Sequence, residues 1–310
     1  MLTLTVISSC GMARLIPGST MTILNFGSCC IDNVYAVPHF VQPGETLAST
    51  DFNIFPGGKG LNQSIALAHA GAEVQHAGKV GEDGRWLKTL LEESGADASR
   101  LQIVDGPSGH ANIQVSASGE NAIVIVGGTN RLITPGDFED AFSGVESGDF
   151  LLLQNEVSHL ADIIKEGDRR GLRIAFNAAP MTTEVMDYPL ELIELLIVNE
   201  TEAAMILGQP VSDQLGEQLA TRFPKMKIVL TLGESGVIYR QGGLAIEQSA
   251  FPVSAVDTTG AGDTFTGFFL AALIRGEEIQ QCLLEACRAA SISVTRPGAA
   301  TSIPQRSELA

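Results

Sequence analysis

Short apolar runs alternate with helical patterns through the second half of the chain. The runs at 150–153, 172–176, 195–198 and 227–232 are wholly or largely apolar, and a segment of helical periodicity adjoins each of them. Strands that are apolar on both faces are typical of a parallel sheet covered by helices. The pattern therefore predicts an α/β fold. We expect its helices over 158–170, 200–207, 212–222, 263–275 and 279–294.

The first half of the chain is richer in strands. Alternating or β-branched residues predict two strand pairs, each joined by a turn sequence. The first pair is 31–41 and 46–54, and the second is 111–116 and 121–126. Two helical patterns, 61–69 and 85–93, lie between the pairs and are followed by Gly71 and Gly95. We interpret the strand pairs as a small β element appended to the α/β body.

Composition supports one large folded unit. The chain has 310 residues, of which 45% are hydrophobic and 18% charged, and it carries no linker that would separate two domains. We predict a single domain over 22–310, with a lid formed by about 31–55 and 111–126. We expect residues 1–21 to form a loose extension, or Met21 to be the true start, because no basic segment precedes their short apolar run.

The charge balance narrows the range of partners. Acidic residues outnumber basic ones 36 to 19, for a formal charge of −17, which disfavours nucleic acid or an anionic membrane surface. A small anionic ligand stays possible because a local site can overcome the overall charge. The five cysteines form no CxxC pair, which favours reduced thiols in a cytoplasmic protein.

The sharpest motif is Val-Asp-Thr-Thr-Gly-Ala-Gly-Asp-Thr-Phe at 256–265, before an apolar helix. Gly260 and Gly262 allow backbone N–H groups to face an anion at the helix N-terminus. Asp263 adds like charge to such a site, so we interpret it as a general base that takes a proton from an attacking hydroxyl. The alternative is that Asp263 only caps the helix.

Two further segments carry weaker signals. The cluster Gly-Gly-Lys-Gly-Leu-Asn-Gln at 57–63 opens a helix, where Lys59 is either a ligand-binding group or a solvated turn lysine. Asn199 and Glu202 follow an apolar strand, where ligands gather in open parallel sheets. They would organise Mg²⁺ through water, or they simply cap the next helix.

Five motifs occur together in one order: Gly27-Ser28-x-x-x-Asp32, Pro43-Gly44-Glu45, Gly57-Gly58-Lys59-Gly60-x-Asn62, Asn199-Glu200-Thr201-Glu202 and Asp257-Thr258-x-x-Ala261-Gly262-Asp263-Thr264-Phe265. With them the chain resembles the ribokinase-like (phosphofructokinase-B type) family of carbohydrate kinases over about residues 22–304. The resemblance implies a three-layer α/β/α fold with a mostly parallel sheet and a small β-sheet lid. It also implies ATP-dependent phosphorylation of a sugar hydroxyl.

The resemblance also implies roles for individual residues. Asp263 would be the base, and the backbone N–H groups of Gly260, Ala261 and Gly262 would form an anion hole for the transferring phosphoryl group. The sugar would contact Asp32, Gly58, Lys59, Asn62 and Glu156. The nucleotide would contact Asn199, Thr231, Gly233, Gly236 and Cys287. Glu202 would hold Mg²⁺ through water, and a monovalent cation such as K⁺ would lie at Asp257, Thr259, Ser293, Arg296, Gly298 and Ser302.

One departure bears on the substrate. Ribokinases carry Asn two residues before the sugar-binding Asp, whereas this chain has Cys30, a weaker hydrogen-bonding partner. The expected substrate is therefore ribose or a similar free sugar. Sugar phosphates are disfavoured because neither lid segment contains Arg or Lys. Tyr35, Phe40 and Phe52 leave a nucleoside open as an alternative, and a non-catalytic sugar-binding protein is the remaining one.

The resemblance further implies an assembly. The lid in this family often pairs with a second copy, so we expect a homodimer through the β lid. Closure of the lid would exclude water from the reacting groups and suppress ATP hydrolysis.

Overall fold

The centre of the molecule is one large sheet. The computed structural model describes residues 21–310, so the extension expected over 1–21 lies outside the described residues apart from Met21. The sheet consists of β1 (Ile23–Phe26), β4 (Val74–Val80), β5 (Leu101–Ile103), β8 (Phe150–Gln154), β9 (Arg173–Asn177), β10 (Leu195–Asn199), β11 (Lys227–Thr231), β12 (Val237–Gln241) and β13 (Leu244–Gln248).

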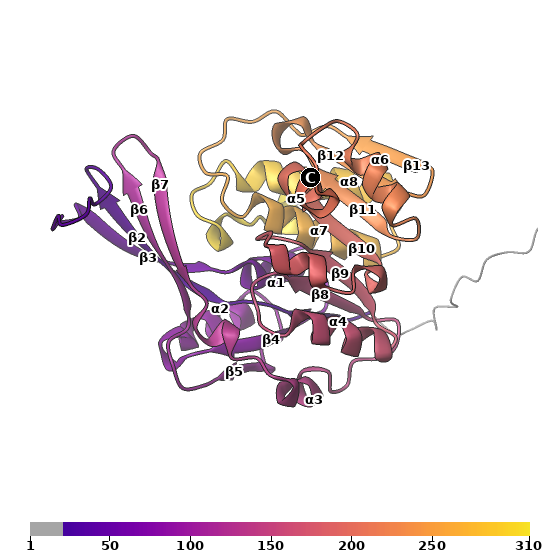
Figure 1. The fold of residues 1–310 in the computed structure, drawn as a ribbon, viewed down its shortest axis with the longest axis horizontal. Coiled ribbons are helices and arrows are strands. Elements are labelled where there is room, and N and C mark those ends of the chain that lie inside the picture. The colour runs from indigo at the N-terminus through magenta and orange to yellow at the C-terminus, as the bar shows by residue number, and fades with distance from the viewer. Residues whose placement is uncertain (1–20) are drawn as a thin grey trace, which may run out of the picture.

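Its strand order is β13-β12-β11-β10-β9-β8-β1-β4-β5 (Figure 1). All neighbours from β11 to β5 pair in parallel, and β12 and β13 add an antiparallel hairpin at one side. The predicted, mostly parallel sheet is confirmed.

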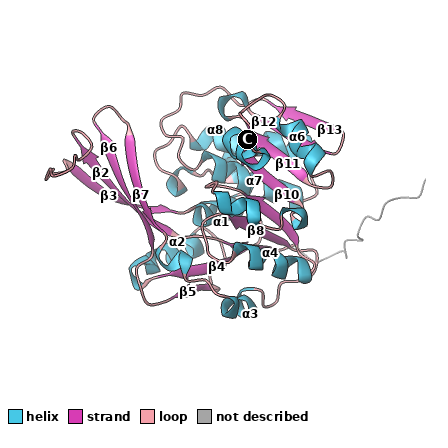
Figure 2. Cartoon of the chain, viewed as in Figure 1, coloured by secondary structure: helices cyan, strands magenta, loops and turns pink. Residues whose placement is uncertain are grey.

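Helices cover both faces of this sheet (Figure 2). Residues of one strand alternate between two apolar clusters: Leu152 belongs to the first, and Leu151 and Leu153 belong to the second. The first cluster includes residues of α1 (Lys59–His69), α2 (Arg85–Glu93), α7 (Ala261–Ile274) and α8 (Ile279–Ser293). The second includes residues of α3 (Phe138–Ala141), α4 (Leu160–Arg169), α5 (Glu200–Leu207) and α6 (Leu215–Arg222). The predicted three-layer arrangement is confirmed.

A smaller, separate sheet projects from the body (Figure 1). Its order is β3-β2-β6-β7, from β3 (Asp51–Gly57), β2 (Cys30–Val37), β6 (Gly109–Ser116) and β7 (Asn121–Val126). The first two strands are shorter than predicted. Because β2 pairs on both sides, it ends before Pro38, which has no N–H to donate. The predicted turn is present, with the Glu45 N–H donating to the Gln42 carbonyl at 3.0 Å.

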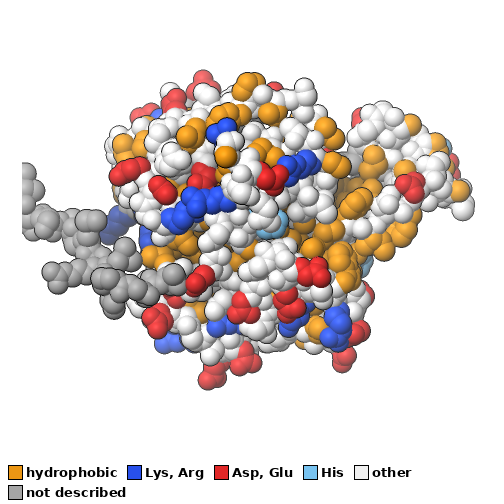
Figure 3. Space-filling model, turned by 180° about the vertical axis from the view of Figure 1, so that it is seen from behind, with side chains coloured by type: hydrophobic (Ala, Val, Ile, Leu, Met, Phe, Trp, Pro, Cys, Tyr) orange, Lys and Arg blue, Asp and Glu red, His pale blue; other side chains and the backbone are white. Residues whose placement is uncertain are grey.

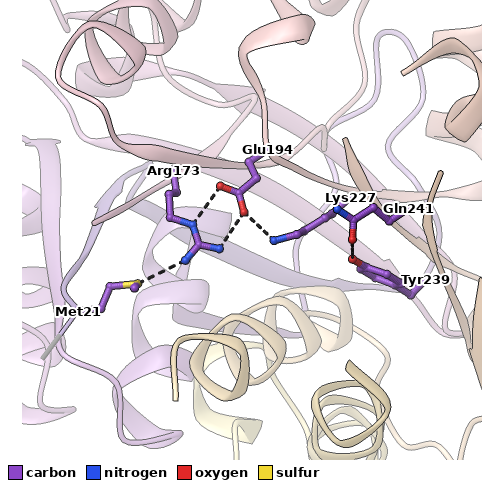
Figure 4. A network of polar contacts seen from close by, with 6 residues as sticks. All are labelled: Met21, Arg173, Glu194, Lys227, Tyr239 and Gln241. Atoms are coloured by element: carbon purple, nitrogen blue, oxygen red, sulfur yellow. Dashed lines mark hydrogen bonds and ion pairs between the residues drawn. The ribbon is translucent and has the colours of Figure 1, made fainter. Parts of the chain in front are cut away.

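Ion pairs tie together the amino edge of the large sheet (Figure 4). Arg173 and Lys227 each donate to Glu194, at 2.8 and 2.7 Å, and Arg173 also lies 4.2 Å from the centroid of the Phe150 ring. Burial alone would raise the pKa of Glu194, but the hydrogen bonds from Arg173 and Lys227 lower it to about 2. At this edge of the sheet, Glu194 is therefore paired with two cations.

The cysteines and the hydropathy of the helices complete the description of the fold. Cys29, Cys30, Cys282 and Cys287 are free thiols, as predicted, and Cys10 lies outside the described residues. Within residues 21–310, no helix combines the length and the hydropathy needed to cross a bilayer.

Candidate active site

The motifs singled out in the sequence meet at the carboxyl edge of the parallel strands, where open α/β sheets bind ligands. The start of α1 forms hydrogen bonds to residues of three other segments. The Leu61 N–H donates to the Ser28 carbonyl after β1 at 2.8 Å, and the Lys59 N–H donates to Glu156 Oε2 after β8 at 2.8 Å. The Asn62 amide donates to Asp263 Oδ2 on α7 at 3.0 Å.

Glycines make this close seating of α1 possible. A Cβ added to Gly60 would lie 2.3 Å from the Ser28 nitrogen, and Gly58 adopts a φ of +94°. Ser28 Oγ donates to Glu156 and accepts from the Gly60 N–H at 3.2 Å. The Gly-Gly-Lys-Gly sequence is thus explained by backbone packing as well as by ligand access.

Asp263 is buried, with 5% of its surface exposed, in the first turn of α7. Two amides hold it: Asn62 donates to Oδ2 at 3.0 Å and Gln63 donates to Oδ1 at 2.8 Å. The residue at the N-cap is Gly260, with φ 75°, and α7 has no side-chain cap. The alternative that Asp263 serves as the helix cap is therefore not what the structure shows.

The first turn of α7 provides backbone donors beside Asp263. Its leading N–H groups have no intrahelical acceptor. The Ala261 N–H makes only a long 3.3 Å bond to the Thr258 carbonyl. A Cβ added to Gly262 would meet nothing within 4 Å, so this turn borders open space. The arrangement suits an anion placed against the turn.

The carboxyl groups of this edge outnumber its cations. Burial, and then the charge of Glu156, raise the pKa of Asp32 to about 6. Burial also raises the pKa of Glu156 and of Glu202. Lys59 faces both glutamates, and it is chiefly Asp263 that raises the Lys59 pKa. Lys59 therefore interacts electrostatically with several acidic groups at once.

The sugar-side residues of the small sheet lie near these groups. Asp32 is on β2, opposite Phe55 of β3. A Cβ at Gly57 would lie 2.2 Å from Asp32 Oδ2. The Cys30 thiol, at the start of β2, accepts from the Asn130 amide at 3.4 Å, and burial raises its pKa, so it stays neutral.

Asn130 was not singled out in the sequence, yet it anchors the root of the small sheet. It donates to the Cys29 carbonyl at 2.9 Å and accepts from the Cys29 N–H at 3.2 Å. The segment Gly-Gly-Thr-Asn at 127–130 is the only sequence signal that marked this position.

Asn199 and Glu202 form the helix cap that the sequence allowed as an alternative. Each side chain accepts from the other residue's N–H at 2.9 Å. Within the described residues, no group of three or more His, Cys, Asp or Glu could hold a metal. A single carboxylate, Glu202, 7% exposed, fits a metal held mainly by phosphate and water rather than by a protein cage.

The residues expected to contact the nucleotide differ in how accessible they are. Asn199 and Thr231 are register partners at the ends of β10 and β11, and a Cβ on Gly233 would meet nothing within 4 Å. A Cβ at Gly236 would lie 2.1 Å from the Gln248 carbonyl, so packing requires that glycine. Cys287 is 7% exposed within the first apolar cluster, where burial raises its pKa to about 12.

The expected cation residues come from the loop before α7 and from the end of α8 with the segment that follows it, and these two parts are bonded together. Asp257 accepts from the Thr259 N–H and the Gly298 N–H, each at 2.9 Å. A Cβ at Gly260 would lie 3.0 Å from that of Ala299, which places these parts beside the start of α7. The Arg296 side chain turns to Glu308, at 2.5 Å. The hydroxyls of Ser293 and Ser302 donate to the carbonyls of Ala290 and Ala299, at 2.9 and 2.8 Å.

Comparison with known proteins identifies the family. Residues 21–306 match the model of the pfkB family carbohydrate kinases. A ribokinase of Haemophilus influenzae is 36% identical over 301 residues, covering 93% of this chain and 96% of its own. The chain therefore belongs to the pfkB family and is a carbohydrate kinase, as the sequence motifs predicted.

Solved structures agree with this assignment. A ribokinase of Cryptococcus neoformans in complex with ADP superposes with a TM-score of 0.82 at 32% identity, covering 93% of this chain and 98% of its own. A ribokinase of Arabidopsis thaliana complexed with ribose and ATP gives a TM-score of 0.83 at 28% identity, covering 94% and 98%. The predicted fold class is confirmed.

Proposed function

We propose that this enzyme transfers the terminal phosphoryl group of ATP to a hydroxyl of ribose or a similar free sugar, with Asp263 as general base. The observation that carries the proposal is the buried Asp263 carboxylate, held by two amides and facing Lys59, beside the first turn of α7. The similarity of the chain to ribokinases, among them complexes with ADP and with ribose and ATP, supports the choice of substrates.

In the proposed reaction, Asp263 takes the proton of the sugar hydroxyl as that oxygen bonds to the terminal phosphorus and the bond to ADP breaks. The backbone N–H groups of Gly260, Ala261 and Gly262 stabilise the charge on the transferring group. The proton ends on Asp263, the phosphoryl group on the sugar, and ADP is the leaving group.

The sugar would be held by hydroxyl contacts. Asp32 accepts from sugar hydroxyls, and Gly58, Lys59 and Glu156 complete the pocket. Asn62 suits this role because its buried Oδ1 has no partner among the described residues, while its amide nitrogen is already bound to Asp263. Cys30 contributes a neutral thiol, which weakens polar recognition at that point and widens the range of sugars accepted.

The nucleotide and the ions would follow the family pattern. Asn199, Thr231, Gly233 and Gly236 line the nucleotide side, with the small exposed part of Cys287. Mg²⁺ neutralises phosphate charge when bound, and Glu202 would hold it through water. K⁺ would lie between the loop before α7 and the end of α8 with the segment after it, at Asp257, Thr259, Ser293, Arg296, Gly298 and Ser302.

We also propose that the small sheet is a lid that pairs with a second copy. Phe55 and Ile125 on the face that carries Asp32, and Ile54 and Val124 on the other, are all exposed. Figure 3 shows apolar side chains gathered on this projecting sheet. Apolar surface of this kind marks an interaction site.

Two of the three aromatic residues named in the sequence offer little to a nucleoside base. The rings of Tyr35 and Phe52 lie tilted to one another, with centroids 4.8 Å apart. Because strand residues alternate between faces, both point to the side opposite Asp32. These two residues therefore do not support the nucleoside alternative.

The test is ADP formation from ATP across free sugars, nucleosides and sugar phosphates, with and without K⁺. Turnover on ribose or another free sugar, stimulated by K⁺, is the expected result. Turnover only on a nucleoside or a sugar phosphate would contradict the proposed substrate class and leave the mechanism standing. Binding of ATP with no turnover on any substrate would contradict the catalytic role of Asp263.

A further inference from the structure

Two adjacent amides on α1 hold the Asp263 carboxylate, and they differ in what else they do. Asn62 donates to Asp263 with its nitrogen but keeps a buried oxygen without a partner among the described residues. Gln63 is fully buried, and every polar atom of its side chain is occupied. Asn62 therefore has a group left for a ligand, whereas Gln63 has none.

The contacts of Gln63 converge from three other elements. Its nitrogen donates to Asp263 Oδ1 on α7 at 2.8 Å and to Asn177 Oδ1 at the end of β9 at 3.1 Å. Its oxygen accepts from the Gln154 amide at the end of β8 at 2.7 Å. The side chain thus joins α1, α7 and two strand ends at one point.

The direction of these bonds is set by the main chain. The Asn177 nitrogen donates to the Ile197 carbonyl at 3.1 Å, so the Asn177 oxygen faces Gln63 and must accept. The Gln63 nitrogen is therefore the end that faces both Asn177 and Asp263. A flipped Gln63 amide would place its oxygen against two acceptors at once.

The far end of the network returns to α1. Gln154 donates a second bond to Asn25 Oδ1 on β1 at 3.0 Å. Asn25 in turn donates to the Gly60 carbonyl at 2.8 Å and to Ser64 Oγ at 2.7 Å. The loop of bonds closes on the helix that carries Gln63, which leaves its amide a single orientation.

We propose that Gln63 is a positioning residue for the reaction: its amide holds Asp263 Oδ1 and fixes the rotation of the carboxylate. The inference rests on the proposed function, in which Asp263 is the base. Other charged groups also face Asp263, namely Lys59 from α1, Glu156 after β8 and Glu202 from α5. They stay in place when Gln63 is changed, so a difference between variants reports Gln63 itself.

The test compares Gln63→Met, which keeps the side-chain length and removes the donor, with wild type. We expect kcat to fall about 10–100-fold, because a misplaced catalytic group costs rate rather than binding. KM for sugar and ATP should stay within about twofold. A loss that is merely structural would instead raise KM together with the fall in kcat.

Two further variants keep the test decisive. Gln75→Met, at the amino end of β4, removes another glutamine that the structure leaves partly buried, and should change neither kcat nor KM. Asn177→Ala frees the Gln63 amide to turn and should lower kcat with KM unchanged, by less than Gln63→Met. If Gln63→Met fails to fold, Asn177→Ala still tests the positioning role.

The outcomes separate the two proposals. If wild type turns over and Asp263→Asn does not, the proposed function stands and the Gln63 variants test this inference alone. An unchanged kcat, or a fall in kcat matched by an equal rise in KM, would overturn the positioning role. An active Asp263→Asn variant would instead overturn the proposed function.

Discussion

At the amino edge of the central sheet, Glu194 accepts from Arg173 and Lys227, and its pKa falls to about 2. At the carboxyl edge, burial raises the pKa of Asp32 to about 6 and that of Glu156 as well. Both edges bury carboxyl groups in the same fold. They differ in the supply of cations, because the amino edge pairs its glutamate twice while the carboxyl edge shares Lys59 among several acids.

This difference separates stability from function. A half-buried carboxylate whose pKa is lowered by its partners stabilises the folded chain at neutral pH, whereas one whose pKa is raised by burial costs free energy there and stays ready for a ligand. Substrate hydroxyls and cations would supply what the carboxyl edge lacks. Proteins commonly accept such a local cost at a functional site. The predictions below test the contrast, beginning with the largest expected effect.

Replacing Asp32 by Asn should raise KM for the sugar by about 10–100-fold, because a charged acceptor is lost. The wild-type kcat/KM should also fall as pH drops through about 6, where Asp32 takes up a proton, and Asp32→Asn should lack that fall. Steady-state kinetics from pH 5 to 8 measure both. Asp51→Asn, on the exposed part of β3, is the matched control. A KM like that of wild type would remove Asp32 from the sugar site.

Replacing Gly57 by Ala should displace the Asp32 carboxylate without changing its chemistry. Its Cβ would lie 2.2 Å from Asp32 Oδ2, so the carboxylate must move. We expect KM for the sugar to rise about tenfold with a smaller change in kcat. Gly243→Ala, in the β12–β13 hairpin, meets no atom within 4 Å and should leave KM unchanged. Equal kinetics for the two variants would contradict the prediction.

Replacing Glu194 by Gln should destabilise the fold and leave KM unchanged. We expect the free energy of unfolding at neutral pH to fall by about 1–3 kcal/mol, between the values for exposed and buried pairs. The pKa of Glu194 is near 4.5 in the unfolded chain and about 2 in the folded chain. The ionised group therefore stabilises the fold above pH 4.5, and this stabilisation is lost as the pH falls towards 2. The difference in urea stability should therefore shrink below about pH 4.5. No loss of stability at neutral pH, relative to an exposed Glu247→Gln control, would refute the pairing.

The same kind of change at the carboxyl edge should have the opposite sign. The folded pKa of Asp32, about 6, lies above its unfolded value of 3.8, so the ionised group costs stability above pH 6. Asp32→Asn should raise the free energy of unfolding at pH 8 by about 1–2 kcal/mol, after allowance for partial exposure. The gain should vanish by about pH 4. A variant less stable than wild type at pH 8 would break the comparison.

The sequence predicted those parts of the molecule whose signals are local. Strands β8 and β10 were predicted because both of their faces meet an apolar layer. Strand β4 was not, because His76 and Lys79 interrupt its apolar pattern, although both are buried and Lys79 pairs with Asp137 at 2.7 Å. The half-exposed hairpin β12–β13 gave no comparable apolar run.

The candidate site shows the same limit. Glycine clusters and strand ends marked Lys59 and Asp263, because the residues that signal a helix start are adjacent in the sequence. The cap of Asn199 and Glu202 was one of the two alternatives that their spacing allowed. The role of Gln63 was not, because its partners Gln154 and Asn177 come from distant parts of the chain. Partnerships of that kind arise only in the folded structure.

The most direct measurement is the turnover of ATP by Asp263→Asn, made beside its binding of ATP and of the sugar that wild type phosphorylates. Our account predicts that both ligands still bind and that ADP formation falls by about 10²–10⁴-fold, the usual contribution of a general base. Turnover close to that of wild type would contradict it, because the buried carboxylate would then have no part in the chemistry.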